Sequence, residues 1–264
     1  MINILFLIGT NNKNSLLKKI ANDISKNLDT KKVKYEVLNI SNLKIINCDG
    51  CRMCFKYGYC KFESKDDVKF ISNKIKKSDL IIVMSSVYSH NIPGKFKSFI
   101  DRISYKTHLL EYSGKVSLTI TSTFSNGSDI VRNYLNKIET NLGIKNIKNY
   151  DYIEINFNYD KFIEDFTKEF NKIIDNNFDF YDKKIEFIFN DYKFGYNLLK
   201  KRLYESLKFY PENEFRFWNQ NWISRSMSYS EFVNRKKENN YNFIEDKIFL
   251  SNVLEDYLNA KHEK

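Results

Sequence analysis

The chain has 264 residues, of which 42% are hydrophobic, 29% are charged and only two are proline. This composition is typical of a globular protein and excludes disordered, collagen-like and low-complexity chains. The longest apolar runs, Ile4–Ile8 and Leu80–Met84, are far shorter than the roughly 20 residues of a membrane-spanning helix. The chain also opens without a basic leader or cleavage signal. We therefore expect a cytoplasmic protein without a transmembrane segment.

Charge and aromatic residues divide the chain into two parts. Residues 1–150 carry 25 Lys/Arg and 12 Asp/Glu, whereas residues 151–264 carry 18 and 21. Aromatic residues show the opposite bias, with 15 in the first part and 27 in the second. A basic region can indicate nucleic-acid binding, but we find no helix-turn-helix, zinc-finger pair or RNA-binding aromatic motif. We expect no nucleic-acid partner, and we expect two units, 1–158 and 159–264.

Strand and helix patterns alternate through the first part. Strands are predicted over 3–8, 33–38, 80–84, 115–121 and 147–155, and helices over 15–28, 67–77, 94–103 and 128–142. This alternation predicts an α/β fold with a doubly wound, five-stranded parallel sheet. Because ligands bind beyond the carboxyl ends of such strands, the loops 9–15, 85–94 and 121–127 should meet at one site.

The second part, residues 159–264, lacks this alternation and is expected to be a mostly helical, aromatic-rich extension. Helices are predicted over 160–175, 191–207 and 245–260, and a short strand over 186–189. The aromatic stretch 209–222 is expected to pack over the first domain or a dimer interface. A lid over the ligand and a surface for a membrane or a partner are the alternatives.

All four cysteines lie in a single loop, at Cys48, Cys51, Cys54 and Cys60. A disulfide framework is not expected in a chain without an export signal. The C-x2-C-x2-C spacing is the one by which iron–sulfur proteins hold a cluster, and the glycines at 50 and 58 can bend the loop so that Cys60 supplies the fourth thiolate. We favour a 4Fe-4S cluster. A zinc site and a cluster-free loop of packed or redox-active thiols are the alternatives.

Three further motifs accompany the cysteine loop, each at the end of a predicted strand. They are G-T-N-N-K-N-S at 9–15, S-S-V-Y-S-H-N-I-P-G-K-F-K-S-F-I-D-R at 85–102 and T-S-T-F-S-N-G at 121–127. In this order the four motifs resemble those of the NAD(P)H-dependent FMN reductases and iron–sulfur flavoproteins of the flavodoxin-like superfamily. The resemblance covers about residues 1–150.

The resemblance implies that FMN is the cofactor, with its phosphate in the first loop and its ring against the other two. The implied FMN-binding residues are Thr10, Asn12, Asn14, Ser15, Leu16, Ser85, Ser86, Val87, Tyr88, Asn91, Thr121, Ser122, Thr123, Phe124 and Asn126. The chain departs from the family pattern where Ser86 replaces a proline and where Asn11 and Asn12 replace a proline and an arginine. Asp101 and Arg102 are expected to form a structural ion pair and helix-end contacts and not to be catalytic groups. His90 is expected to be exposed without a catalytic role.

An FMN-dependent oxidoreductase is the function that these features predict. Its electrons would come from NAD(P)H or from a small-molecule or protein carrier, and they would pass through the iron–sulfur cluster. No catalytic side chain is expected, because the flavin carries the chemistry. A non-catalytic electron-transfer or redox-sensing flavoprotein is the alternative. Because relatives complete the flavin site across subunits, we expect a homodimer or tetramer.

Overall fold

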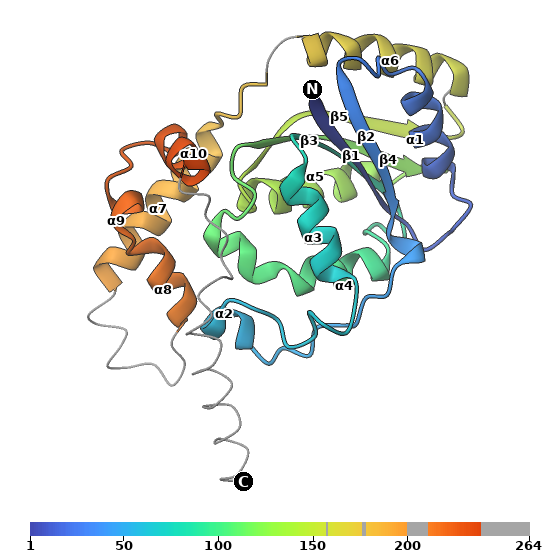
Figure 1. Ribbon diagram of the computed structural model, residues 1–264. Helices are drawn as coiled ribbons and strands as arrows, with labels where there is room; N and C mark the ends of the chain where they lie inside the picture. Colours follow the sequence, from blue (N-terminus) through green and yellow to red (C-terminus); the bar gives the residue numbers. More distant parts are fainter. Residues whose placement is uncertain (157, 176–177, 200–210, 239–264) are drawn as a thin grey trace.

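The first part of the chain forms one parallel sheet of five strands, as the computed structural model shows (Figure 1). The structure describes residues 1–156, 158–175, 178–199 and 211–238. The strands are β1 (Ile2–Gly9), β2 (Val33–Asn39), β3 (Leu80–Ser86), β4 (Lys115–Thr123) and β5 (Ile144–Ile153). Their order across the sheet is β2-β1-β3-β4-β5, and every pair is parallel. This is the flavodoxin-like order, so the predicted fold class is confirmed.

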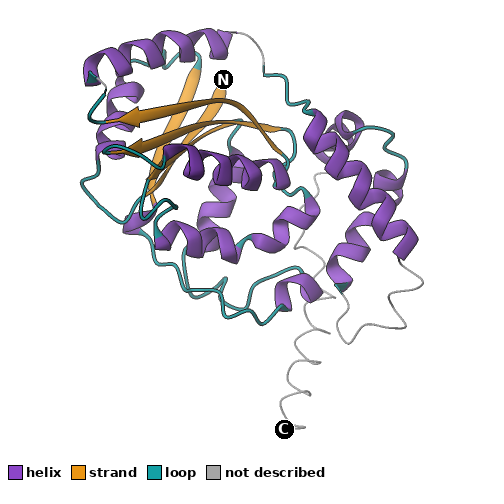
Figure 2. Ribbon diagram, turned by 180° about the vertical axis from the view of Figure 1, so that it is seen from behind, coloured by secondary structure: helices purple, strands orange, loops and turns teal. Residues whose placement is uncertain are grey.

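Helices cover both faces of the sheet (Figure 2). The helices α1 (Leu16–Lys26) and α6 (Tyr159–Asp175) pack on one face, in a core that includes Phe6 and Phe166. The helices α3 (Val68–Lys77), α4 (Gly94–Arg102) and α5 (Ser128–Asn141) pack on the other, in a core that includes Leu7 and Phe99. Successive residues of β1 therefore point into different cores, as the pleat of a strand requires.

The remaining helices form a third core at one end of the α/β domain. They are α7 (Lys183–Leu199), α8 (Glu212–Trp218), α9 (Asn221–Ser224) and α10 (Tyr229–Glu238). Their buried aromatic side chains surround Trp218 and pack against the 3-10 turn η2 (Ser104–Leu109) and against α2 (Met53–Tyr57). The mostly helical extension is confirmed, and its helix α8 lies beside α2 of the cysteine loop (Figure 1).

The strand predicted over 186–189 is wrong, because these residues belong to α7. Ile185 and Phe189 are both fully buried at helical spacing, and this burial suits a helix with one face on the core. The helix predicted over 245–260 and the end of that predicted over 191–207 lie outside the described residues. The domain boundary after residue 158 stays a prediction. None of the described helices combines the length and apolar character needed to cross a membrane.

Candidate functional site

Three loops leave the sheet at neighbouring points of its carboxyl edge. The strand register pairs Gly9 of β1 with Ser85 of β3, and Ser85 with Thr121 of β4. The chain order reverses between β1 and β3, so this edge contains the switch point where ligands bind in doubly wound sheets. The structure therefore brings together the three loops that the sequence predicted would meet.

The first of these loops, residues 10–15, has hydroxyl and amide groups at the start of α1. Thr10 is buried and its hydroxyl accepts the N–H of Asn12 at 3.2 Å. Ser15 caps α1 by accepting the N–H of Lys18 at 3.3 Å. The first N–H groups of a helix have no intrahelical acceptor and favour an anion there. The loop therefore has the donor groups that a phosphate requires.

Lys13 is a feature of this loop that the motif comparison missed. It is exposed between Asn12 and Asn14, in the loop that precedes α1. In the family pattern an arginine stands where this chain has Asn12. Lys13 nevertheless supplies a cation one position further on. The sequence contains this lysine next to the motif positions, but only the structure shows that its side chain is exposed and can face a ligand.

The second loop, residues 87–91, folds as a tight two-residue turn. Tyr88 and Asn91 exchange both backbone hydrogen bonds, at 2.8 and 2.9 Å. Ser89 and His90 between them have φ values of 49° and 56°, which are the positive values of a type I′ turn. His90 is exposed, as expected. The turn holds the half-exposed Tyr88 ring near the edge of the sheet.

The third loop, residues 124–127, packs directly on the second. Gly127 has a φ of 81°, and a Cβ there would lie 2.8 Å from His90 Nδ1 and 3.0 Å from Val87 Cγ1. The backbone N–H of Val87 also donates to the carbonyl of Ser122 at 3.0 Å. Phe124 beside this contact is 68% exposed. The two loops form one wall, and among the residues that the structure describes no element covers the ring of Phe124.

The cysteine loop lies apart from these three loops, between α4 and the extension. Cys54 is in the short helix α2, and Gly50 and Gly58 on either side have φ values of 69° and 81°. These positive values show that both glycines bend the chain as the sequence predicted. All four cysteines line one cavity of about 50 Å³. Cys48 and Cys51 are exposed, whereas Cys54 and Cys60 are half-buried.

The four cysteines of this cavity offer thiolates, which are the ligands that iron–sulfur clusters take. Within the described residues, no three His, Cys, Asp or Glu side chains are placed to hold a single metal ion. A 4Fe-4S cluster would take one thiolate on each iron. Burial, and then the neighbouring thiols, raise the pKa of Cys54 to about 12. Cys54 is therefore a neutral thiol at pH 7 in the metal-free chain, and metal binding must release its proton.

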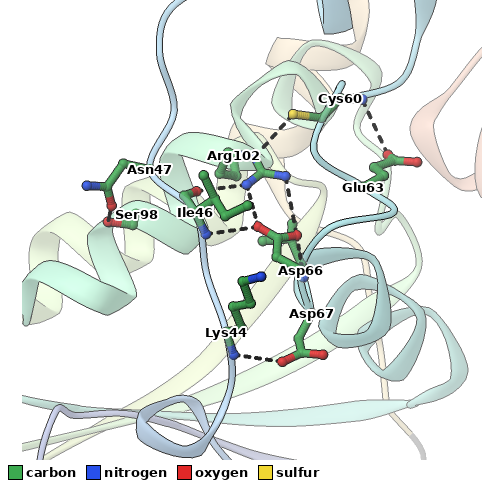
Figure 3. Close-up of polar contacts among 10 residues, drawn as sticks. Lys44, Ile46, Asn47, Cys60, Glu63, Asp66, Asp67, Ser98 and Arg102 are labelled. Carbon is green, nitrogen blue, oxygen red and sulfur yellow. Dashed lines mark hydrogen bonds and ion pairs between the residues drawn. The ribbon is translucent and has the colours of Figure 1, made fainter.

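Arg102 ties the cysteine loop to α4 (Figure 3). Its guanidinium group is fully buried, pairs with Asp66 at 2.5 Å, and donates from Nε to Cys60 Sγ at 3.1 Å. The ion pair that we expected between Arg102 and Asp101 is wrong, since Asp101 pairs with Lys97 one helical turn earlier. Neighbouring residues of a helix point in different directions and do not face each other.

Helix α4 connects the two candidate sites. Its first residue, Gly94, follows the loop 87–91, and its last residue, Arg102, contacts Cys60. Nine helical residues at 1.5 Å each span about 12 Å between their first and last Cα atoms. One rigid helix therefore fixes the separation between the turn at the sheet edge and the cysteine loop.

The extension covers the other side of the cysteine loop. Glu214 of α8 is buried, and its carboxylate bonds His108 Nδ1 at 3.0 Å and the hydroxyl of Tyr196. The His108 ring lies between Phe55 and Tyr192, with ring centroids 5.3 and 6.0 Å away. No sequence pattern predicts the contact between Glu214 and His108, because the two residues are 106 positions apart. It anchors the extension beside Cys54.

The fold and the loops at its switch point define a flavodoxin-like α/β protein. Residues 2–157 match the NADPH-dependent FMN reductase family, and the chain belongs to that family. Among curated proteins it is similar to an iron-sulfur flavoprotein of Archaeoglobus fulgidus, with 29% identity over 52% of this chain and 62% of that protein. An iron-sulfur flavoprotein of Clostridioides difficile is 29% identical over 47% of this chain and 55% of that protein.

The chain matches between half and two thirds of the length of the two curated relatives. Among solved structures, a NAD(P)H:quinone oxidoreductase from Methanothermobacter marburgensis superposes on 66% of this chain and 96% of its own, with a TM-score of 0.50 and 14% identity. At that identity the likeness shows the fold alone.

Proposed function

We propose that this chain is an FMN-dependent oxidoreductase whose cofactor binds at the three loops of the sheet edge. The observation that carries the proposal is the register of Gly9, Ser85 and Thr121, which aligns the starts of the three loops at the switch point. Membership of the NADPH-dependent FMN reductase family supports the same cofactor. When bound, FMN supplies hydride and single-electron chemistry.

The side chains and backbone of the loops have distinct parts in this proposal. Thr10, Ser15 and the first turn of α1 bind the phosphate, with Lys13 adding a positive charge. The turn 87–91 and the strand end at Thr121–Thr123 hold the edges of the flavin ring. The remaining implied FMN contacts are Asn12, Asn14, Leu16, Ser85, Ser86, Phe124 and Asn126.

The four cysteines are proposed to hold a 4Fe-4S cluster. This proposal is supported by the cavity that the cysteines share and by the positive φ values of Gly50 and Gly58. It is also supported by the similarity to iron-sulfur flavoproteins. Cys48, Cys51, Cys54 and Cys60 would each bind one iron. NAD(P)H or an external electron carrier is the proposed donor, and α4 sets the distance between flavin and cluster. A redox-sensing protein is the second candidate, because the thiols of Cys48 and Cys51 are exposed to oxidants.

The proposed assembly is a homodimer or tetramer. Phe124 is 68% exposed and Tyr88 42% exposed, both on loops at the proposed flavin site. Two large exposed rings at one site are typical of a surface that another element covers. A second copy of the chain is the proposed cover, so light scattering of the FMN-loaded protein should give at least twice the chain mass.

The cofactor site is tested by changing the phosphate loop. Thr10→Leu combined with Ser15→Leu removes both hydroxyl groups and fills the space beside α1. We expect this double variant to lose FMN binding, measured by quenching of flavin fluorescence. Thr30→Leu, an exposed residue of the turn before β2, is the matched control and should keep the affinity. Unchanged FMN affinity in the double variant would remove the phosphate-loop assignment.

Sustained turnover distinguishes an oxidoreductase from a redox-sensing protein. Purified FMN-loaded protein should oxidise NADH or NADPH continuously when a quinone is added as acceptor. A single turnover followed by no further oxidation, with FMN still bound, would favour the redox-sensing candidate.

A further inference from the structure

Arg102 is a buried cation that the proposed flavin site does not use. Its side chain has 0% exposure, and so has that of its ion-pair partner Asp66. Its Nη1 also donates to the carbonyl of Ile46 at 2.7 Å, and its Nε donates to Cys60 Sγ at 3.1 Å. The guanidinium group lies 5.0 Å from the centroid of the Phe62 ring. Its donors therefore reach three different partners.

These partners lie on both arms of the cysteine loop. Ile46 precedes Cys48 by two residues, and Cys60 and Asp66 lie where the loop returns to α3 (Figure 3). Asp66 strengthens the connection, because its carboxylate accepts the backbone N–H groups of Ile46 at 2.9 Å and Val68 at 3.2 Å. One ion pair thus holds the start of the loop against its end.

An arginine suits this position better than a lysine would. The planar guanidinium group has five N–H donors in a fixed arrangement, whereas an ammonium group is a point charge. A lysine at 102 could pair with Asp66, but its single nitrogen could not also serve both the Ile46 carbonyl and the Cys60 sulfur. N–H groups that donate to cluster thiolates are among the features that set a cluster's reduction potential.

We propose that Arg102 is the positioning residue of the cysteine loop: it fixes the separation of the two arms and donates a hydrogen bond to the Cys60 sulfur that raises the potential of the cluster. The proposal rests on the cluster proposed above. The contacts of Arg102 to Ile46 and Asp66 do not depend on a bound metal, so they can be tested independently.

Three variants separate these effects. Arg102→Lys keeps the charge and the ion pair but removes the donor to Cys60. Arg102→Gln combined with Asp66→Asn removes the whole ion pair without leaving an unpaired buried charge. Arg235→Lys makes the same chemical change on α10, where Arg235 is 38% exposed and pairs with Glu231. It is the matched control. Far-UV circular dichroism checks that each variant is folded.

The first measurement is hydrogen exchange of the cluster-free chains, followed by mass spectrometry. We expect the amides of residues 44–47 and 60–67 to exchange at least tenfold faster in the double variant than in the wild type, and no faster in Arg235→Lys. The same exchange in the wild type and the double variant would overturn the inference, whether or not the protein binds iron.

The second measurement is a redox titration of the iron-loaded proteins, with iron and sulfide determined on the same samples. We expect Arg102→Lys to keep its cluster but to shift its potential downward. At the potential where half of the wild-type cluster is reduced, less than a quarter of the cluster in Arg102→Lys should be reduced. A full cluster with an unchanged potential in Arg102→Lys would overturn the role of the hydrogen bond to Cys60. A wild type without iron would instead refute the proposed cluster. The exchange result would still decide whether Arg102 fixes the separation of the two arms of the loop.

Discussion

Glu139 makes the stability of the protein depend on pH. This carboxyl group of α5 is buried beneath β4 and β5, where Thr119 Oγ1 and Asn146 Nδ2 each donate to it at 3.0 Å. Burial raises the pKa of Glu139 from 4.5 to about 7, and the hydrogen bonds oppose this rise only in part. The folded protein therefore prefers the protonated carboxyl, whereas the unfolded chain ionises near the ordinary value.

The size and sign of the effect follow from linkage. A pKa that is higher in the folded state contributes stability below pH 4.5, and this contribution is lost as the pH rises through 7. The shift from 4.5 to about 7 corresponds to about 3 kcal/mol at 1.36 kcal/mol for each pH unit. Replacing Glu139 by glutamine keeps the shape of the protonated group and removes the charge. Glu139→Gln should therefore be more stable than the wild type at pH 8 by up to about 3 kcal/mol.

The assay is urea unfolding of wild type and variant at several values from pH 5 to pH 9. The difference in unfolding free energy between wild type and variant should be small at pH 5 and should grow through pH 7. The other titrating groups are the same in both proteins, so their contributions cancel in this difference. Glu164→Gln, on the exposed face of α6, is the matched control and should change stability by less than about 0.5 kcal/mol at every pH. A wild type–Glu139→Gln difference that does not change with pH would show that the buried carboxyl titrates normally and would refute this reasoning.

Three further substitutions test the site and the extension. Gly127→Ala should weaken FMN binding at least tenfold in a fluorescence titration, because its Cβ would meet His90 and Val87 at a φ that L residues rarely adopt. Lys13→Gln should lower the affinity for FMN by about twofold to fivefold and leave riboflavin affinity unchanged, since an exposed charge contributes up to about 1 kcal/mol. Trp218→Ala should destabilise the extension by about 3–5 kcal/mol in guanidinium unfolding, because it empties a fully buried site.

Each of these has its own control. Gly195→Ala adds a Cβ with nothing within 4 Å and should leave FMN binding intact. An equal loss of FMN affinity in both glycine variants would show that the contact of residue 127 with His90 is not the cause. Equal losses of FMN and riboflavin affinity in Lys13→Gln would place the lysine away from the phosphate. Trp222→Ala, at a ring that is only partly buried, should cost less than Trp218→Ala, and the reverse order would mean that Trp218 is not the centre of the extension core.

The sequence could predict the α/β domain because its signals are local and periodic. Short apolar strands such as Leu80–Met84 are buried on both faces, and amphipathic helices such as α1 separate them, so the parallel sheet follows from pattern and handedness. The three loops could be predicted to meet for the same reason, because the ends of neighbouring parallel strands lie together.

Long-range polar contacts could not be predicted in this way. The partner of Arg102 is Asp66 and not the adjacent Asp101, since helix geometry separates neighbours and the cysteine loop folds back onto α4. The contact of Glu214 with His108 joins residues 106 positions apart, for which a sequence pattern carries no signal. The strand predicted over 186–189 was wrong because a short apolar stretch fits either structure, and only packing of Ile185 and Phe189 in one core decides for the helix.

Cofactor content after anaerobic purification tests the central claim most directly. FMN, iron and acid-labile sulfide are determined for each chain in the wild type and in a Cys60→Ser variant. For each chain of the wild type we predict about one FMN, four iron and four sulfide. For the variant we predict the same FMN content and a lower iron content. Wild-type protein without FMN would contradict the proposed site at the sheet edge, and full FMN with no iron would contradict the proposed cluster.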